Sequence, residues 1–271
     1  MDQAQHLATS RHNLTDEAYQ TERHLAARCL YDHQTPTWDL PALASGLIAG
    51  HRPHDILEVG CGDGLYVEKL RSDFPRARVI AADLSKSIMQ GIEDPRVVAD
   101  IHALPFSDHS FDAVLAMHML YYVPDIPQAI TELARLCRPG GLTVVSTVAE
   151  QDKAEIDALW AKASALVNGR PIPTQAPRMA PLGFTLDNAP DLLRKSFTEV
   201  QSADMQSRIT LTHAAPLLAH LESQRSFIDL SDAEFAETLN TARMLAEGQI
   251  AERGMFTTNC HVGFVVARQP R

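Results

Sequence analysis

The stretch Ile56-Leu57-Glu58-Val59-Gly60-Cys61-Gly62-Asp63-Gly64 decides the fold of this chain. An apolar run ends in an acid and is followed by three alternating glycines. Apolar residues then recur at helical spacing over 65–70, which predicts a buried strand, a tight turn and a helix start. Glycines in such a turn permit a positive φ and let a ligand approach the main chain closely. The first N–H groups of the new helix then face that ligand.

Four further strands are predicted downstream of this turn. Residues 78–83 form an apolar run that ends in an acid, at the spacing expected of a ribose-binding carboxylate. The strand predicted at 97–100 also ends in an acid. Two more are predicted at 111–117 and 142–146, the last of them preceded by the turn Arg138-Pro139-Gly140-Gly141. Strands that alternate with helices predict a parallel sheet with right-handed crossovers.

The glycine turn differs from that of dinucleotide-binding proteins. Its spacing is Gly-x-Gly-x-Gly, whereas a pyrophosphate-binding turn has Gly-x-Gly-x-x-Gly. No arginine follows Asp83 directly, as one would beside the 2′-phosphate of NADP. In this order, the five segments resemble the class I S-adenosylmethionine-dependent methyltransferases, in particular the branch that acts on small molecules. The resemblance covers roughly residues 50 to 150.

This resemblance implies an α/β fold with a cap. We expect a Rossmann-like, mostly parallel seven-stranded sheet with helices on both faces and an antiparallel last strand, plus a helical cap. The expected organisation is one structural domain with a cap, made of an N-terminal helical cap (1–50), a cofactor-binding core (51–150), cap or lid insertions with a sixth strand (151–256), and a closing strand and tail (257–271).

Periodicity places the remaining elements along the chain. Helices are predicted from Thr15 and over 41–49, 126–136, 151–166, 189–195, 213–223 and 232–253, and strands from Phe197 and over 256–267.

The resemblance also implies S-adenosylmethionine as the cofactor. Asp83 should accept hydrogen bonds from both ribose hydroxyls, because a carboxylate has two oxygens for them. Asp100 should accept from the adenine amino group, and the Ile101 N–H should serve a ring nitrogen. Glu58 is expected either to hold the turn or to contact the methionyl ammonium through water. The expected cofactor-binding set is Glu58, Gly60, Cys61, Gly62, Asp83, Leu84, Met89, Asp100, Ile101 and Met117.

The catalytic candidates follow the fourth strand, where the family places its catalytic motif. His118 is one residue beyond Met117 and is expected to point at the acceptor, with a titration range suited to a general base. Alternatively, His118 only orders a loop or a water. Tyr121 and Tyr122 are the other catalytic candidates, although one of them can instead pack under the following helix.

The acceptor pocket is expected to involve the N-terminal part of the chain. In the family that this chain resembles, N-terminal helices often lie over the cofactor and help to close that pocket. The candidates here are Tyr19, Tyr31 and His33. Alternatively, Tyr31 and Trp38 only anchor the helix pair to the core, since aromatic side chains with a polar end commonly do so.

Composition limits the class of protein and of partner. The 271 residues are 45% hydrophobic and 21% charged, as in a globular protein, and the formal charge is −10. Because nucleic-acid binders usually carry a basic face, this charge argues against a nucleic-acid substrate. The four scattered cysteines form no C-x-x-C pair, so we expect neither a metal site nor disulfides. We expect a cytoplasmic monomer or homodimer with a polar start, no signal peptide and no membrane contact.

Four functions compete on this sequence. The first is in-line transfer of a methyl group to a small molecule, of the kind made in secondary metabolism. The second keeps the cofactor but attacks the sulfonium elsewhere, as in cyclisation of its aminocarboxypropyl arm. An RNA methyltransferase and a non-catalytic cofactor-binding module are the minor alternatives, and the acidic charge argues against the RNA enzyme.

Overall fold

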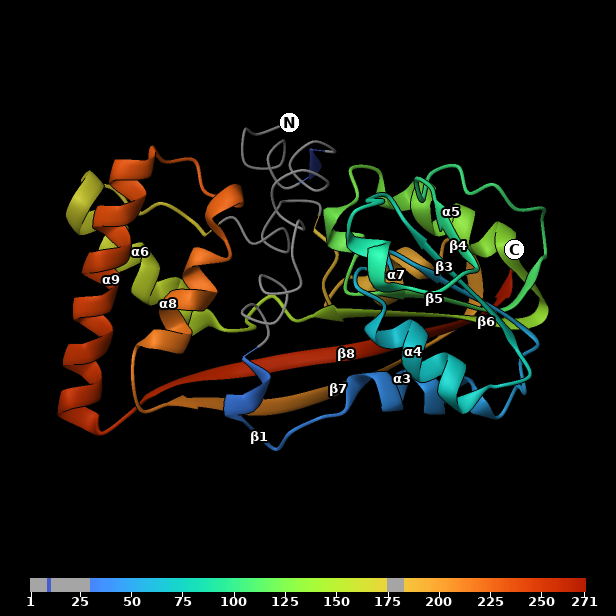
Figure 1. The fold of residues 1–271 in the computed structure, drawn as a ribbon, viewed down its shortest axis with the longest axis horizontal. Coiled ribbons are helices and arrows are strands. Elements are labelled where there is room, and N and C mark those ends of the chain that lie inside the picture. Colours follow the sequence, from blue (N-terminus) through green and yellow to red (C-terminus); the bar gives the residue numbers. More distant parts are fainter. Residues whose placement is uncertain (1–8, 11–29, 175–182) are drawn as a thin grey trace. The chain divides into compact units, whose positions relative to one another are not determined.

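The computed structural model of this chain describes residues 9–10, 30–174 and 183–271 (Figure 1). The helix predicted from Thr15 and the pocket candidate Tyr19 therefore lie outside the described residues, as does the side chain of Tyr31. The chain forms two compact units. Unit 1 takes its described residues from Met1–Thr37, Gln151–Gly183 and Gln206–His261, and unit 2 from Trp38–Glu150, Phe184–Met205 and Val262–Arg271.

Five parallel strands form the centre of unit 2. They are β2 (Asp55–Val59), β3 (Arg78–Asp83), β4 (Arg96–Val98), β5 (Phe111–Met117) and β6 (Cys137–Val148). β2 pairs with β3 on one side and with β5 on the other, so the chain changes direction across the sheet beside β2. In open α/β sheets, ligands bind beyond the carboxyl ends of the strands at such a switch point.

Two antiparallel strands complete the predicted sheet. β8 (Phe256–Pro270), the long red arrow in Figure 1, pairs antiparallel with β6, with Val148 opposite Val262. β7 (Phe197–Leu211) lies next to β8. The seven predicted strands are all present and the predicted fold class is confirmed. The described sheet has eight strands in the order β1-β7-β8-β6-β5-β2-β3-β4, because the two residues of β1 (Gln34–Thr35) pair with β7.

Helices flank the sheet of unit 2. α3 (Leu40–Ala49) packs against α4 (Leu65–Asp73), and α5 (Ile126–Leu136) packs against α7 (Ala189–Leu193). Local sequence fixes where α3 and α5 begin. Asp39 accepts a hydrogen bond from Ala42 N at 2.9 Å, which caps α3 as an N-cap acid does.

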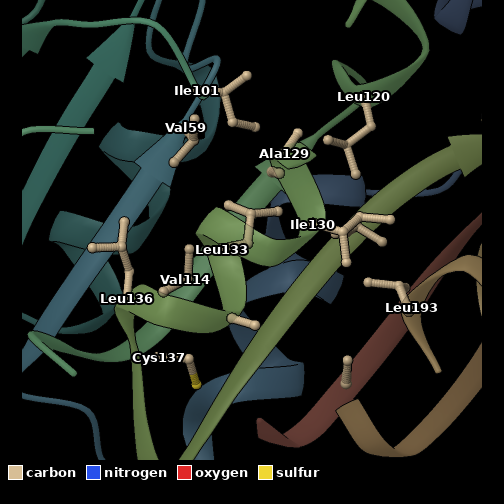
Figure 2. Packing of buried hydrophobic residues seen from close by; sticks show 14 of the residues in the cluster. Val59, Ile101, Val114, Leu120, Ala129, Ile130, Leu133, Leu136, Cys137 and Leu193 are labelled. Carbon is tan, nitrogen blue, oxygen red and sulfur yellow. The ribbon is translucent and has the colours of Figure 1, made fainter. Parts of the chain in front are cut away.

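The apolar face of α5 holds the core of unit 2 together. Ile130 and Leu133 of α5 lie fully buried among side chains from β2, β5 and α7, as Figure 2 shows for Val114 and Leu193. Leu57 and Val59 of β2 belong to the same cluster. Because side chains alternate across a strand, the residues between them point to the other face of the sheet.

Unit 1 contains three α-helices among its described residues: α6 (Ala154–Asn168), α8 (Ala215–Glu222) and α9 (Asp232–Arg253). The rings of Trp160 on α6 and Phe235 on α9 lie 5.5 Å apart. Ser231 and Glu234 form a reciprocal capping box at the start of α9, which satisfies backbone N–H groups that the helix leaves open. Short 3-10 helices cover Tyr31–His33, Ile88–Gly91, Leu120–Tyr122 and Arg225–Phe227.

One local prediction was wrong in its boundary. The segment Arg138-Pro139-Gly140-Gly141 was expected to be a turn before a strand at 142–146. Instead it lies inside β6, which starts pairing at Cys137 opposite Phe111 and shifts register before Leu142 opposite Ala113. Gly140, with φ +82°, allows this irregularity without ending the strand.

Two further observations bear on the class of protein. Over the described residues, no helix combines the length and the apolar character needed to cross a membrane. Over the same residues, no group of three or more histidine, cysteine or acidic side chains is placed to hold a metal ion.

Candidate functional site

The glycine turn after β2 is held against β3 by its own backbone. The N–H groups of Gly60 and Cys61 both donate to the carbonyl oxygen of Ala82, at 2.7 and 3.1 Å. Gly60, Gly62 and Gly64 all have positive φ, at +69°, +55° and +95°. Side-chain-bearing residues adopt such angles at a cost, so this path of the chain requires glycine.

The same turn leaves no room for larger residues. A Cβ atom on Gly60 would lie 2.7 and 2.8 Å from Cγ and Cβ of Met119, which follows β5. A Cβ atom on Gly64 would lie 2.8 Å from Cγ1 of Ile92. Gly64 is also the N-cap of α4 and offers no side-chain cap, so the first N–H groups of that helix are not used by it.

Asp83 ends β3 and is tied to the glycine turn. Its Oδ2 accepts a hydrogen bond from Gly62 N at 3.0 Å, and its Oδ1 accepts one from Ser85 N at 2.8 Å. Burial raises the pKa of this carboxyl, and the backbone hydrogen bonds oppose that rise. Each carboxylate oxygen has a second lone pair, so both remain able to accept from a ligand.

Glu58 lies one residue from the end of β2 and is 1% exposed. Neither of its carboxylate oxygens has a hydrogen-bond partner among the described residues. Burial, and then the charges of Asp83 and Asp63, raise the pKa of Glu58 well above its usual range. Burial and the charge of Glu58 also raise the pKa of the Cys61 thiol, so Cys61 is a buried, protonated thiol.

The predicted adenine residues are distributed over two segments. Leu84 is half-buried directly after Asp83, whereas Met89 is only 1% exposed. Ile101 is buried in the core cluster of unit 2. Asp100 Oδ1 accepts from the backbone N of His102 at 3.0 Å and lies 2.7 Å from His102 Nδ1.

His118 has an unusual backbone conformation directly after β5. Its φ is +52°, which is rare for a residue with a side chain. Its N–H donates to Ser146 on the neighbouring strand β6, to both the backbone oxygen at 3.2 Å and Oγ at 3.0 Å. Met117, at the end of β5, is 5% exposed. Left-handed residues held in this way gather at functional sites, where the surrounding structure enforces them.

The two tyrosines differ in their surroundings. Their rings lie 4.6 Å apart at 63° in the short helix Leu120–Tyr122. Tyr121 packs against the core cluster of unit 2, which matches the expectation that one of them packs inward. Both side chains are half-buried.

Unit 2 thus gathers most of the predicted site residues at the carboxyl ends of neighbouring strands. Glu58, Asp83 and Met117 belong to β2, β3 and β5, and Asp100 follows β4. The predicted pocket residue His33 belongs to unit 1, where its ring lies 6.4 Å from that of His213.

Three residues at this site were not predicted from the sequence. His102 pairs with Asp100, Met119 covers Gly60, and Ser146 holds the backbone of His118. Only His102 had a local signal, because an Asp-x-His spacing lets the carboxylate bond its own chain two residues on. Met119 and Ser146 reach the site through the pairing of strands.

The family model of a methyltransferase domain matches residues 57–145, which run from β2 into β6. Curated relatives include the malonyl-[acyl-carrier protein] O-methyltransferases of Hahella chejuensis, 32% identical over 115 residues, and of Halorhodospira halophila, 32% identical over 118 residues. The alignments cover 40% and 41% of this chain, and 41% and 40% of those proteins. The chain therefore spans about two fifths of the length of the curated relatives it matches.

Solved structures share the fold over a larger part of the chain. A putative methyltransferase from an antibiotic biosynthesis pathway of Anabaena variabilis has a TM-score of 0.56 at 18% identity, covering 83% of this chain and 96% of that one. A putative methyltransferase of Bacillus halodurans has a TM-score of 0.53 at 14% identity, covering 84% and 98%. Together with the family match, these similarities confirm the predicted class I methyltransferase core and S-adenosylmethionine as the cofactor of that core.

Proposed function

We propose that this chain transfers a methyl group from S-adenosylmethionine to a small molecule. The observation that carries the proposal is the match of residues 57–145 to the methyltransferase domain, over the same segment that holds the glycine turn and Asp83. When bound, the cofactor supplies an electrophilic methyl group on a positively charged sulfur. The protein then needs to align donor and acceptor and to exclude water, and orientation alone is worth roughly 7–11 kcal/mol.

The residues present fit this cofactor. Gly60 keeps the turn free of a side chain at the point where the chain bends back toward β3, so a ligand can lie against the backbone. Asp83 has both oxygens oriented by backbone N–H groups and is placed for ribose hydroxyls. Glu58 is a buried acid without a partner in the described chain, which suits a cationic group. Asp100 and the backbone of Ile101 would take the adenine edge.

His118 is the residue that we place at the reacting centre. The bonds from its N–H to Ser146 fix its backbone at the end of β5, beside the proposed methionyl site. A histidine so placed accepts a proton from a hydroxyl acceptor, or orients an acceptor that carries no proton to lose. Tyr122 is the second candidate, since Tyr121 packs against the core.

The acceptor that we favour has an oxygen nucleophile. The curated relatives are named for O-methyl transfer to a malonyl group on acyl-carrier protein, and this favours methyl transfer over cyclisation of the cofactor's own arm. Because the match covers about two fifths of those proteins, the carrier-linked acceptor itself is not carried over. We propose an acidic or hydroxyl-bearing small molecule, with Tyr19, Tyr31 and His33 as pocket residues and no nucleic-acid partner, in a cytoplasmic monomer or homodimer.

The test is to supply the purified protein with S-adenosylmethionine carrying an isotopically labelled methyl group. Small carboxylic acids, phenols and their acyl-carrier thioesters serve as acceptors. Label in one acceptor class, together with stoichiometric S-adenosylhomocysteine, supports the proposal. Release of 5′-methylthioadenosine would instead indicate attack within the aminocarboxypropyl arm. Failure to bind S-adenosylhomocysteine at all would overturn the proposed cofactor.

A further inference from the structure

Glu58 presents a physical problem that the fold alone does not solve. It is 1% exposed, in the middle strand of the sheet, and neither carboxylate oxygen has a hydrogen-bond partner among the described residues. Leaving a buried acceptor unsatisfied costs about 1–3 kcal/mol, and more for a charged group. Since Leu57 and Val59 point into the α5 cluster, Glu58 points to the opposite face of the sheet.

The surroundings of Glu58 offer no positive charge among the residues that the structure describes. Its neighbours across the sheet are Ala81 on β3 and Leu115 on β5, both apolar. The charged groups that act on it are acids, Asp83 at the end of β3 and Asp63 in the glycine turn, and the Cys61 thiol is a third titratable neighbour. Burial and these charges favour the neutral carboxyl, so Glu58 holds its proton well above the usual range of a glutamate pKa.

A cation is the ligand that would reverse this balance. An ammonium group brought next to the carboxyl supplies both a hydrogen-bond donor and a positive charge that offsets the acids nearby. S-adenosylmethionine carries such a group at the end of its aminocarboxypropyl arm. We propose that Glu58 directly receives this ammonium, and that its carboxyl group releases one proton to solvent as the cofactor binds. The inference rests on the proposed function, because it takes this cofactor as the ligand.

The proposal has a direct thermodynamic consequence. The ammonium stays protonated on binding while the O–H bond of Glu58 breaks, so the complex holds one proton fewer than its free components. Affinity therefore rises with pH, by up to about tenfold per pH unit, between the pKa of Glu58 in the complex and its pKa in the free protein. Above the second of these values the affinity becomes independent of pH.

Titration calorimetry measures this proton directly. S-adenosylhomocysteine is titrated into the protein at one neutral pH in two buffers of different ionisation enthalpy, so that the difference in heat counts the protons released. We expect about one proton per site. 5′-Methylthioadenosine keeps the nucleoside and the thioether but lacks the arm, and it should release none.

Two variants assign the proton to Glu58. Glu58→Gln is neutral and nearly isosteric, so it should fold, release no proton and bind S-adenosylhomocysteine about ten- to a hundredfold more weakly. It should bind 5′-methylthioadenosine as the unmodified protein does. Asp63→Asn removes one neighbouring acid but keeps Glu58, so the pH range in which the proton is released should move down.

The outcomes separate the inference from the proposed function. Binding of S-adenosylhomocysteine with equal heats in the two buffers would overturn this inference and leave the proposed function standing. Equal proton release with 5′-methylthioadenosine, or release retained in Glu58→Gln, would assign the proton elsewhere and also overturn it. If neither ligand binds, the proposed function falls and the inference falls with it.

Discussion

The backbone N–H of Gly62 donates a hydrogen bond of 3.0 Å to Oδ2 of Asp83, which joins the glycine turn after β2 to the end of β3. These residues are 21 positions apart in sequence. The bond means that the carboxylate takes up its orientation from the protein before any ligand arrives. It also means that a change at Asp83 acts on the turn as well as on the ribose contact.

Asp83→Ala should weaken binding of S-adenosylhomocysteine by at least about tenfold, because a hydrogen bond to a charged group is worth about 1.5–3 kcal/mol. Titration calorimetry measures the loss. Asp191→Ala is the matched control, since Asp191 is an exposed acid of the same unit that forms a surface pair with Arg194. Unchanged affinity in Asp83→Ala would remove Asp83 from the site.

Gly60→Ala should lower both stability and cofactor affinity. A left-handed conformation costs about 1–2 kcal/mol in a residue with a Cβ atom, and the new Cβ also overlaps Met119. Urea denaturation measures the first effect. In Gly60→Ala/Met119→Ala the overlap is relieved, so part of the loss should return. Gly91→Ala is the control, because open space surrounds Gly91; equal losses in the two single variants would contradict the prediction.

His118→Ala should lower turnover by roughly 10²–10⁴ if His118 is a general base, with little change in cofactor affinity. The rate of the unmodified protein should then fall at acid pH, because a protonated imidazole takes up no proton. If His118 only positions the acceptor, His118→Asn should keep most of the activity with a flat pH profile. His51→Ala, at an exposed position, is the control. Full activity in His118→Ala would exclude both roles and move the proposal to Tyr122.

The free energy of unfolding should depend on pH through Glu58. Its pKa is higher in the folded protein than in the unfolded chain, so the folded state holds its proton more tightly. This contribution is fully present below the unfolded value and is lost as pH rises through the folded value, at about 1.4 kcal/mol for each unit between them. Urea denaturation of Glu58→Gln should therefore show a stability advantage over the unmodified protein that grows with pH. A difference that stays constant from acid to alkaline pH would contradict this.

His102→Phe should weaken cofactor binding by about two- to tenfold, because Asp100 loses the side-chain hydrogen bond that orients it. His102→Asn keeps a donor near the same place and should restore most of the affinity. The loss should be smaller for an analogue whose adenine amino group is replaced by a carbonyl, since Asp100 is proposed to accept from that amino group. Equal losses for both ligands would make His102 a purely structural residue.

The sequence predicted the parts of the fold that depend on local periodicity. The bounds of β5 and α5 are those expected, because an unbroken apolar run and a regular helical stripe leave little choice. β1 was not predicted, since Gln34 and Thr35 are polar and their partner Ile209 is far away in the chain. The early start of β6 was missed for the same reason, as only pairing with Phe111 keeps Cys137 in the sheet.

The candidate site was predictable in position but not in detail. The strand pattern of the sequence is enough to place Glu58 and Asp83 at one edge of the sheet, because both fall at the ends of parallel strands. No pattern in the sequence states that Glu58 lacks a partner among the described residues, because this depends on side chains from β3 and from the turn. The left-handed backbone of His118 is likewise set by Ser146 on another strand. Both features arise from tertiary structure.

The path of β7 and β8 limits how this protein can be re-engineered. Each strand has residues in both units, since the boundaries at 205–206 and 261–262 fall inside them. Unit 1 is moreover assembled from three chain segments. It cannot be transplanted as a cassette, because two of the junctions would sever hydrogen-bonded strands. New specificity is therefore more accessible by substitution in place than by recombination of whole modules.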